Sequence, residues 1–188
     1  YPEWFGRNVE ALKQVQPEPL KPEDISFVLG STWIPVKYYR DFMYEKFATS
    51  KHNRDSNIHI EFAEYTGTYF ITEKRAERDS IAANKTYGTE RLNAYEIMEY
   101  TLNLKTVEVR DRQEYEDPET GEEKVRYVLN KRETLLAREK QAQIKMEFES
   151  WLFAEPERGA ALTQLYNDRF NNIRPRTYNG DDLMLPDM

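Results

Sequence analysis

The residue types that carry out metal or acid–base chemistry are mostly carboxylates in this chain, which has 34 Asp and Glu and two His, and one small group of them is spaced so that it could act together. Asp111 and Glu122 fall on either side of a predicted hairpin turn, with Lys124 close by. Two carboxylates with a lysine nearby bear a rough likeness to the site of a nuclease that uses a divalent metal ion. The same residues fit an acidic hairpin tip held in water, which is the reading that we favour. The nuclease is kept as an alternative.

The other common chemistries lack their residues. Cysteine is absent, which excludes disulfides, thiolate zinc sites and cysteine nucleophiles. The two histidines, His52 and His59, lie in a polar loop and in a predicted strand, without the spacing of a metal site. The sequence has no P-loop, no dinucleotide-binding glycine motif and no nucleophile elbow. We therefore expect no catalytic residue, no metal ion and no cofactor in this chain.

The charge pattern allows a binding role. A net charge of −7 argues against a general nucleic-acid coat, because phosphate affinity comes from Lys and Arg. The charge is uneven, since residues 124–176 hold 11 basic against 7 acidic residues and residues 1–123 hold 16 against 24. Any DNA contact is therefore expected in the basic C-terminal third. The candidate residues are Arg132, Lys140, Lys145, Arg174 and Arg176.

Two aromatic residues could stack on unpaired bases. Trp33 and Tyr87 each lie in a loop that leads into a predicted helix, and an exposed ring in such a loop can stack on a base. The alternative is that both rings are core residues, and we favour it. The two loops are alike, because a glycine followed by Ser or Thr, at Gly30 and Gly88, precedes the helix in each.

Alternating helical and strand patterns predict the elements that must position these residues. Thr89 and Asn130 are the expected N-caps of two of the helices. Apolar residues at a period of two around turn residues predict β-hairpins at 58–72 and 105–129. Apolar residues at helical spacing predict helices at residues 3–15, 36–47, 90–102, 131–153 and 156–170.

These elements predict an α+β fold. Two β-hairpins are expected to form one antiparallel sheet with helices on one face, followed by a C-terminal helical pair. No apolar run is long enough to cross a bilayer, so no membrane contact is expected. The expected parts are an N-terminal helix and Pro-rich linker (1–22), an α+β domain of two loop–helix–hairpin units (23–129), a helical region (130–171) and a linker (172–188).

Several ordered phrases resemble one known family. They are "NVEALKQVQP", "LGSTWIP", "TYGTERLNAYEIMEYTLNL", "LNKRETLLAREKQAQIKMEF" and "YNDRFNNIRPRTYNG". The sequence resembles the segment between the methyltransferase and helicase modules of very large bacterial proteins of plasmids, phages and conjugative elements. Those proteins join an N6-adenine DNA methylase region to an SNF2-like helicase and are related to phage antirestriction proteins. The resemblance spans nearly the whole chain.

The resemblance implies a cytoplasmic protein that acts on DNA, of which this chain is a fragment. It implies that the flanking methyltransferase and helicase modules are the partners, and it carries over no catalytic residue. The expected function is a non-catalytic module that couples these modules and guides DNA by weak, non-specific contacts. The alternatives are the metal-dependent nuclease and a pure protein-interaction domain.

Overall fold

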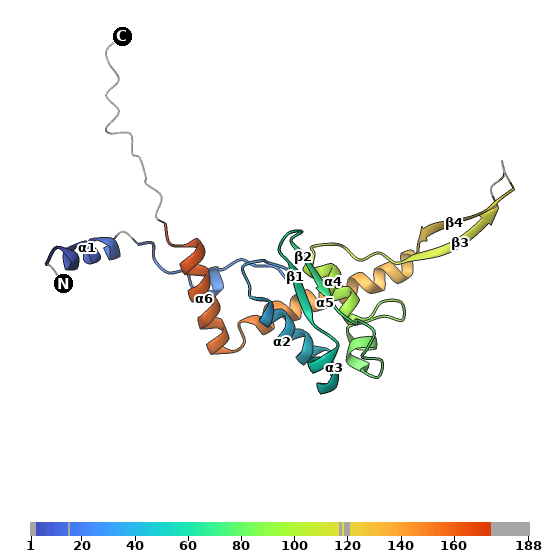
Figure 1. The fold of residues 1–188 in the computed structure, drawn as a ribbon, viewed down its shortest axis with the longest axis horizontal. Helices are drawn as coiled ribbons and strands as arrows, with labels where there is room; N and C mark the ends of the chain where they lie inside the picture. Colours follow the sequence, from blue (N-terminus) through green and yellow to red (C-terminus); the bar gives the residue numbers. More distant parts are fainter. Residues whose placement is uncertain (1–2, 15, 117, 119–120, 174–188) are drawn as a thin grey trace, which may run out of the picture. The chain divides into compact units, whose positions relative to one another are not determined.

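The computed structural model describes residues 3–14, 16–116, 118 and 121–173 (Figure 1). In this part of the chain helices alternate with two antiparallel hairpins, so the predicted α+β class is confirmed. The elements are α1 (Glu3–Gln14), a 3-10 turn η1 (Pro22–Asp24), α2 (Val36–Lys46), α3 (Lys51–Ser56), β1 (Ile60–Ala63), β2 (Thr68–Ile71), a π-helical turn η2 (Ala82–Thr86), α4 (Ala94–Leu102), β3 (Arg110–Glu116), β4 (Glu123–Leu129), α5 (Lys131–Leu152) and α6 (Pro156–Phe170).

The chain divides into two compact units at other boundaries than those expected. The larger unit spans Phe27–Pro156, and the smaller one joins Tyr1–Ser26 to Glu157–Met188. Helix α5 therefore belongs with the hairpins and α4, and not with α6 in a separate C-terminal region. The reason is that α5 supplies buried side chains to the same core as α2 and α4.

The core of the larger unit is a cluster of aromatic rings. Phe148 of α5 meets Phe42 edge to face and Tyr39 at a tilt, with ring centroids 5.2 and 5.3 Å apart. Trp151 packs against Phe42 at 5.5 Å. Aromatic pairs in such geometries contribute about 0.5–1.5 kcal/mol beyond the area that they bury. Phe148 and Trp151 thus anchor α5, as their helical spacing predicts.

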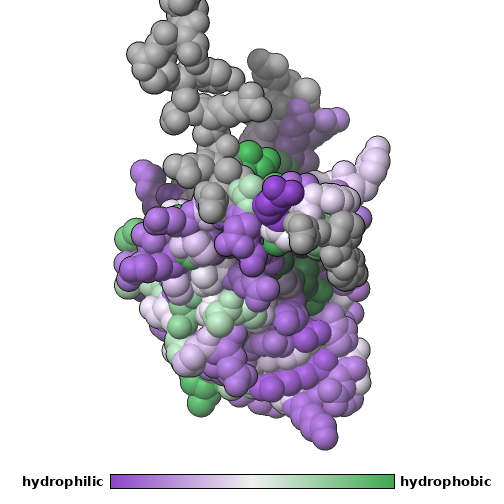
Figure 2. Space-filling model, turned by 90° about the vertical axis from the view of Figure 1, so that its left-hand side faces the viewer, coloured by the Kyte–Doolittle hydropathy of each residue, from purple (hydrophilic) through white to green (hydrophobic). Residues whose placement is uncertain are grey.

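One face of the chain is largely polar. On the face shown in Figure 2, hydrophilic residues cover most of the area and hydrophobic residues form small separate groups. Within the described residues, no helix combines the length and the apolar character that a membrane span requires.

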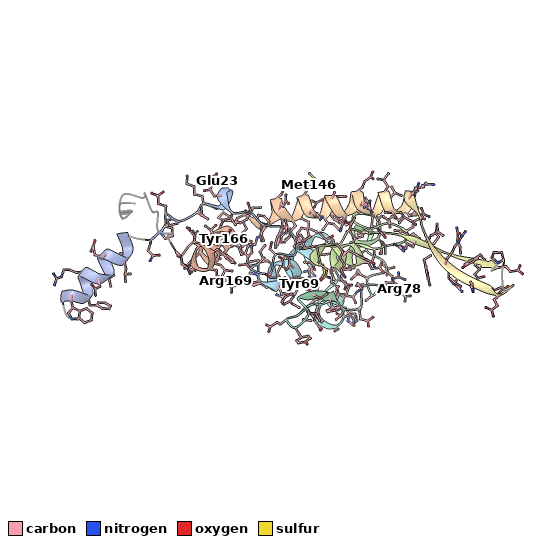
Figure 3. All side chains as sticks on the ribbon, turned by 90° about the horizontal axis from the view of Figure 1, so that it is seen from above. Glu23, Tyr69, Arg78, Met146, Tyr166 and Arg169 are labelled. Atoms are coloured by element: carbon pink, nitrogen blue, oxygen red, sulfur yellow. The ribbon has the colours of Figure 1, made fainter. Side chains whose placement is uncertain are left out.

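The β3–β4 hairpin extends from α5 with side chains on both of its faces (Figure 3). Thirteen of its 14 strand residues are exposed, and Asp111 is half-buried. The register pairs Arg110 with Leu129 and Glu116 with Glu123. An isolated two-stranded hairpin is marginally stable in water, so its attachment at the base matters. There Asp111 accepts hydrogen bonds from Arg91 and Asn130, each 2.8 Å long.

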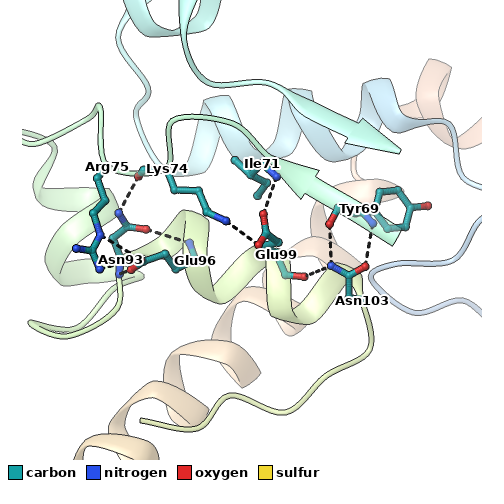
Figure 4. A network of polar contacts seen from close by, with 8 residues as sticks. All are labelled: Tyr69, Ile71, Lys74, Arg75, Asn93, Glu96, Glu99 and Asn103. Atoms are coloured by element: carbon teal, nitrogen blue, oxygen red, sulfur yellow. Dashed lines mark hydrogen bonds and ion pairs between the residues drawn. The ribbon is translucent and has the colours of Figure 1, made fainter. Parts of the chain in front are cut away.

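The two hairpins are confirmed, but they do not join into the single sheet that was expected. Figure 4 shows the reason, which is that side chains of α4 occupy the outer edge of β2. The Tyr69 amide donates to Asn103 Oδ1 at 2.8 Å, and the Ile71 amide donates to Glu99 Oε2 at 2.7 Å. Asn103 Nδ2 also donates to the Tyr69 carbonyl. Another strand could add to this edge only by displacing α4.

Helix α4 begins four residues later than predicted, and its N-cap is Asn93 rather than Thr89. Asn93 Oδ1 accepts from the Glu96 amide, and the Glu96 carboxylate accepts from the Asn93 amide. This reciprocal pair satisfies two amides at the start of the helix. Thr89 closes a turn instead, because its hydroxyl accepts from the Leu92 amide at 3.0 Å.

The two glycines of the similar loops pack against opposite ends of α4. A Cβ atom on Gly30, whose φ is +107°, would overlap the carbonyl oxygen of Leu102 in the last turn. A Cβ atom on Gly88 would overlap the Ala83 carbonyl oxygen and press on the amide of Ala94 in the first turn. Glycine is required at both places because backbone meets backbone there.

In the smaller unit α6 holds the extended segment before η1. The Leu20 amide donates to Asn167 Oδ1 at 2.7 Å, and Asn167 Nδ2 donates back to the Leu20 carbonyl at 3.0 Å. Asn171 makes a further bond to the Glu18 carbonyl. One asparagine thus pairs with both polar groups of one backbone residue, as Asn103 does with Tyr69.

The contact of Gly30 with α4 predicts a large effect of one methyl group. Gly30→Ala should lower the free energy of unfolding by about 2–4 kcal/mol, since it combines left-handed strain with a backbone overlap. Gly67→Ala is the matched control, because Gly67 also has a positive φ but has open space around it. It should cost about 1–2 kcal/mol. Urea unfolding measures both, and equal effects would contradict the close approach.

The tether between α4 and β2 gives a second prediction. Asn103→Ala leaves the amide and the carbonyl of Tyr69 without partners and should cost about 2 kcal/mol in the free energy of unfolding. Asn172→Ala is the control, because the one side-chain bond of Asn172 to the described residues goes to the carbonyl of Asp168 at the surface. It should change stability by less than about 0.5 kcal/mol. Chemical denaturation of both variants tests this, and a neutral Asn103→Ala would show that the tether is unimportant.

Candidate nucleic-acid interface

The loop between η2 and α4, residues 87–93, is fixed at several points. The Tyr87 ring is buried against Phe47, with centroids 5.4 Å apart, and its hydroxyl donates to Glu147. Burial, followed by the bonded Glu147 carboxylate, raises the pKa of Tyr87, so the phenol stays protonated. Thr89 and Leu92 close the turn described above. The core therefore holds the residues of this loop in place.

Two polar hollows flank this loop, and both are lined by Asn84, Thr89 and Glu90. The first has a volume of about 590 Å³ and the second about 490 Å³. Six basic residues and four glutamates line them together. We call the six the basic surface: Arg75, Arg78 and Arg91 line the first hollow, and Lys85, Arg132 and Lys140 line the second.

Half of the basic surface is free to meet a ligand. The side chains of Arg78, Lys85 and Arg132 form no ion pair with any residue in the described ranges, and all three are exposed. Arg75 pairs with Glu96 at 2.9 Å. Arg91 pairs with Asp111 at 2.8 Å, but 46% of its side-chain surface remains exposed. An exposed pair of this kind is weak, so a polyanion can compete for its guanidinium.

The glutamates around the hollows are partly occupied by the protein itself. Glu77 Oε2 accepts from the Ser50 amide, the Ser50 hydroxyl and Asn53, at 2.7–2.9 Å. Burial alone would raise the pKa of Glu77, but these hydrogen bonds outweigh it and lower the pKa. Glu96 caps α4 and pairs with Arg75. Both carboxylates thus bond to protein donors and remain negatively charged at neutral pH.

The predicted DNA-contact residues do not lie together. Arg132 and Lys140 line the second hollow, where Lys140 Nζ donates to the Thr86 carbonyl at 2.7 Å. Lys145 is exposed on another flank of α5, because five residues turn a helix by about 140° from Lys140. Arg174 and Arg176 lie outside the described residues.

The two stacking candidates lie in different surroundings. Tyr87 is buried, with 8% of its surface exposed, so its ring is not available to stack on a base, and the core reading holds for it. It is buried because the ring fills the space between Phe47 and α5. Trp33 is half-buried in the turn before α2 and makes contacts within the protein.

The DNA-contact residues predicted from the sequence do not include four members of the basic surface. Arg75, Arg78, Lys85 and Arg91 fall in the part of the chain whose overall charge is negative, so counting charge by segment concealed them. The sequence does contain a sign of this surface, because these four cations lie within 17 residues around the second glycine loop. What the sequence does not show is that two of the neighbouring glutamates, Glu77 and Glu96, bond to protein donors.

The acidic hairpin does not assemble a metal site in the described ranges. No group of three or more His, Asp or Glu side chains there is placed to hold a metal ion. Asp111 lies opposite Val128, while Glu122 precedes the start of β4, so six residues of strand, about 20 Å, separate the two levels. Hydrogen bonds from Asn130 and Arg91 lower the pKa of Asp111.

In a comparison with family models, a family matches residues 28–172 of the chain. The family is described as "Domain of unknown function (DUF8437)". No curated protein and no solved structure matches the chain.

The bonds to Glu77 predict a pH-dependent stability. Because the pKa of Glu77 is lower in the folded state than its ordinary value of 4.5, its stabilisation is present at neutral pH and lost as the pH falls below that value. Glu77→Gln should cost about 1 kcal/mol at pH 7 and progressively less toward pH 3. Unfolding in urea at several pH values measures this. A cost that is constant with pH would contradict the role of the charge.

Proposed function

The chain belongs to the DUF8437 family, whose description assigns no activity, and we propose that it is a non-catalytic module that binds DNA weakly and couples the parts of a larger DNA-processing protein. Its partners are the methyltransferase and helicase modules that flank the segment it resembles. The basic surface makes the DNA contact, and it binds phosphates rather than base edges.

The observation that carries this proposal is the gathering of six cations around one rigid loop in an acidic protein. Four of them come from residues 75–91 and two from α5, so the fold brings together charges that are far apart in the sequence. Exposed Lys and Arg side chains that neutralise phosphates release counterions, and this release supplies most of the affinity of non-specific DNA binding. Phosphate contacts set the position of a protein on DNA without reading sequence.

The lining of the hollows also supports binding rather than catalysis. Around the first hollow, Glu77 and Glu96 accept hydrogen bonds from the protein and are not gathered on one point. A hydrolase that uses metal ions needs several carboxylates converging on one position. The nuclease alternative therefore has little support from the described residues.

The coupling role rests on the resemblance set out above. A module that holds DNA between a methyltransferase and a helicase gains from weak binding, because DNA must move past it. Linking it to tighter-binding modules raises the local concentration of DNA, so a low intrinsic affinity is sufficient.

A salt titration with fluorescent DNA tests the proposal. We expect dissociation constants in the range of ~10⁻⁴–10⁻⁶ M for non-specific binding. Lys85→Ala combined with Arg132→Ala should lower the slope of log affinity against log salt by about two units, one for each lost phosphate contact. Neither substitution removes an ion pair or hydrogen bond seen among the described residues, so stability should be preserved.

Four comparisons make the result specific. The control, Lys145→Ala combined with Lys51→Ala, removes two exposed lysines that do not line either hollow and should leave the salt slope unchanged. Arg174→Ala combined with Arg176→Ala tests residues 174 and 176. If only this variant loses binding, the DNA contact is not made by the basic surface. No binding by the unmodified chain at low salt would reject DNA binding. Cleavage of the DNA in Mg²⁺ that Glu122→Ala abolishes would establish the nuclease instead.

A further inference from the structure

The outer edge of β4 is an exposed strand edge with an apolar face. Val125, Tyr127 and Leu129 point to the same side of the hairpin, since side chains alternate along a strand. They are 44%, 64% and 41% exposed. On that face β3 contributes Arg110, Arg112 and Glu114, which are paired along their own strand: Arg112 with Glu114, and Arg110 with Glu108.

The register shows which backbone groups of β4 face outward. The Asn130 amide donates to the Val109 carbonyl at 2.9 Å, so residue 130 points toward β3. In an antiparallel pair the direction alternates with every residue. The amides of Glu123, Val125, Tyr127 and Leu129 therefore point away from β3. None of these amides donates to another residue in the described part of the chain. The open amides and the exposed apolar side chains belong to the same residues.

The other edge of the hairpin, along β3, is less suited to pairing with a further strand. Five of the seven residues of β3 are charged, compared with three of the seven in β4. Charged residues on an edge strand discourage pairing. At the base of β3, Arg91 also reaches the outward carbonyl of Arg110, at 3.4 Å. A strand that adds to this hairpin therefore finds an open edge on β4 and not on β3.

The sequence of β4 complements itself about Tyr127. When two β4 strands lie antiparallel with Tyr127 opposite its own copy, Val125 falls opposite Leu129, and Arg126 falls opposite Val128. The outward amides and carbonyls of residues 125, 127 and 129 then face those of the second copy, as an antiparallel ladder requires. No like charges are opposed, and six apolar side chains form one continuous face. Aromatic and β-branched residues that meet across strands stabilise such a sheet.

From this we propose that two copies of the chain dimerise through β4, and that their hairpins form a four-stranded antiparallel sheet around a two-fold axis at Tyr127. Such an interface is isologous, because the same surface serves both copies. It goes beyond the proposed DNA binding and does not depend on it.

The charges at the ends of the pairing are complementary. In this register Glu123 of one copy reaches the level of Lys131, the first residue of α5 in the second copy. The tip of the hairpin is acidic, with Glu116 and Glu122 beside Glu123, and α5 begins with Lys131. Each end of the sheet thus brings an acidic tip to a basic helix start, and opposite charges of this kind fix the register of an interface.

Sedimentation of the full 188-residue chain over micromolar to millimolar concentrations tests the dimer. We expect a species of twice the 22.5 kDa chain mass. Val125→Pro removes an outward amide without removing a bond to β3, and it should weaken dimerisation by roughly tenfold or more, because each copy loses a hydrogen bond. Glu114→Pro is the matched control. Glu114 lies opposite Val125 in the same hairpin, and its amide faces outward at the other edge. It should leave the dimer intact.

A cross-linking experiment checks the same register without a proline. The chain has no cysteine, so Tyr127→Cys introduces a single thiol. Residues opposed in a hydrogen-bonded pair have Cα atoms about 5.5 Å apart, within the range of a disulfide. Mild oxidation should join two Tyr127→Cys chains, whereas Glu114→Cys chains should remain single.

Three results would overturn the proposal. The first is a chain that stays monomeric throughout the concentration range. The second is a dimer that Glu114→Pro weakens as much as Val125→Pro does, and the third is equal cross-linking of the two cysteine variants. Circular dichroism of each variant confirms that the larger unit is folded, so that loss of the dimer is not mistaken for unfolding.

Discussion

The structure depends on polar side chains of helices that bond to extended backbone. Helix α4 holds β2 through Glu99 and Asn103, and α6 holds Leu20 through Asn167. Helix α5 does the same for the segment before β3, where Gln141 accepts from the Val107 amide. Peptide groups that leave water must find partners, and here helices supply them where a larger sheet usually would. This explains how the chain can carry two small sheets that never merge.

The same arrangement makes α4 the centre of the larger unit. One face of the helix is buried, and the polar positions from Asn93 to Asn103 bind β2 and the loop that follows it. The two glycine loops press against its two ends. Because the loop at residues 87–93 is held by the core on one side and by α4 on the other, the cations around it are presented by a rigid support. A surface that binds phosphates benefits, since little conformational freedom is lost on binding.

The sequence allowed much of this fold to be predicted, and the errors have physical causes. Periodicity located both hairpins and the long helices, because burial of one face sets the spacing of apolar residues. It could not show that β2 has no free edge, since Glu99 and Asn103 look like ordinary polar residues of a helix surface. The start of α4 was misplaced because Thr89 and Asn93 both suit an N-cap, although Glu96 at the third position after Asn93 marks a capping box. The short polar helix α3 has no apolar pattern to reveal it.

The candidate site was harder to predict than the fold. Arg132 and Lys140 were identified from the charge of the C-terminal third, while their neighbours Arg75, Arg78, Lys85 and Arg91 come from a part of the chain that is acidic overall. A local charge depends on which charged side chains the fold brings together, and this is a property of tertiary structure. A sum of charges over a segment of the sequence therefore misses a surface that is built from residues 75–91 and from α5.

The bond between Leu20 and Asn167 has a consequence for synthesis on the ribosome. Its two partners are 147 residues apart in the chain, and they bracket the whole of the larger unit. At 5–20 residues per second, the segment around Leu20 leaves the ribosome roughly 7–30 s before its partner helix. In that interval the larger unit can fold by itself, while the segment around Leu20 lacks the helix that binds it. The smaller unit is therefore completed last, when α6 emerges and bonds to that segment.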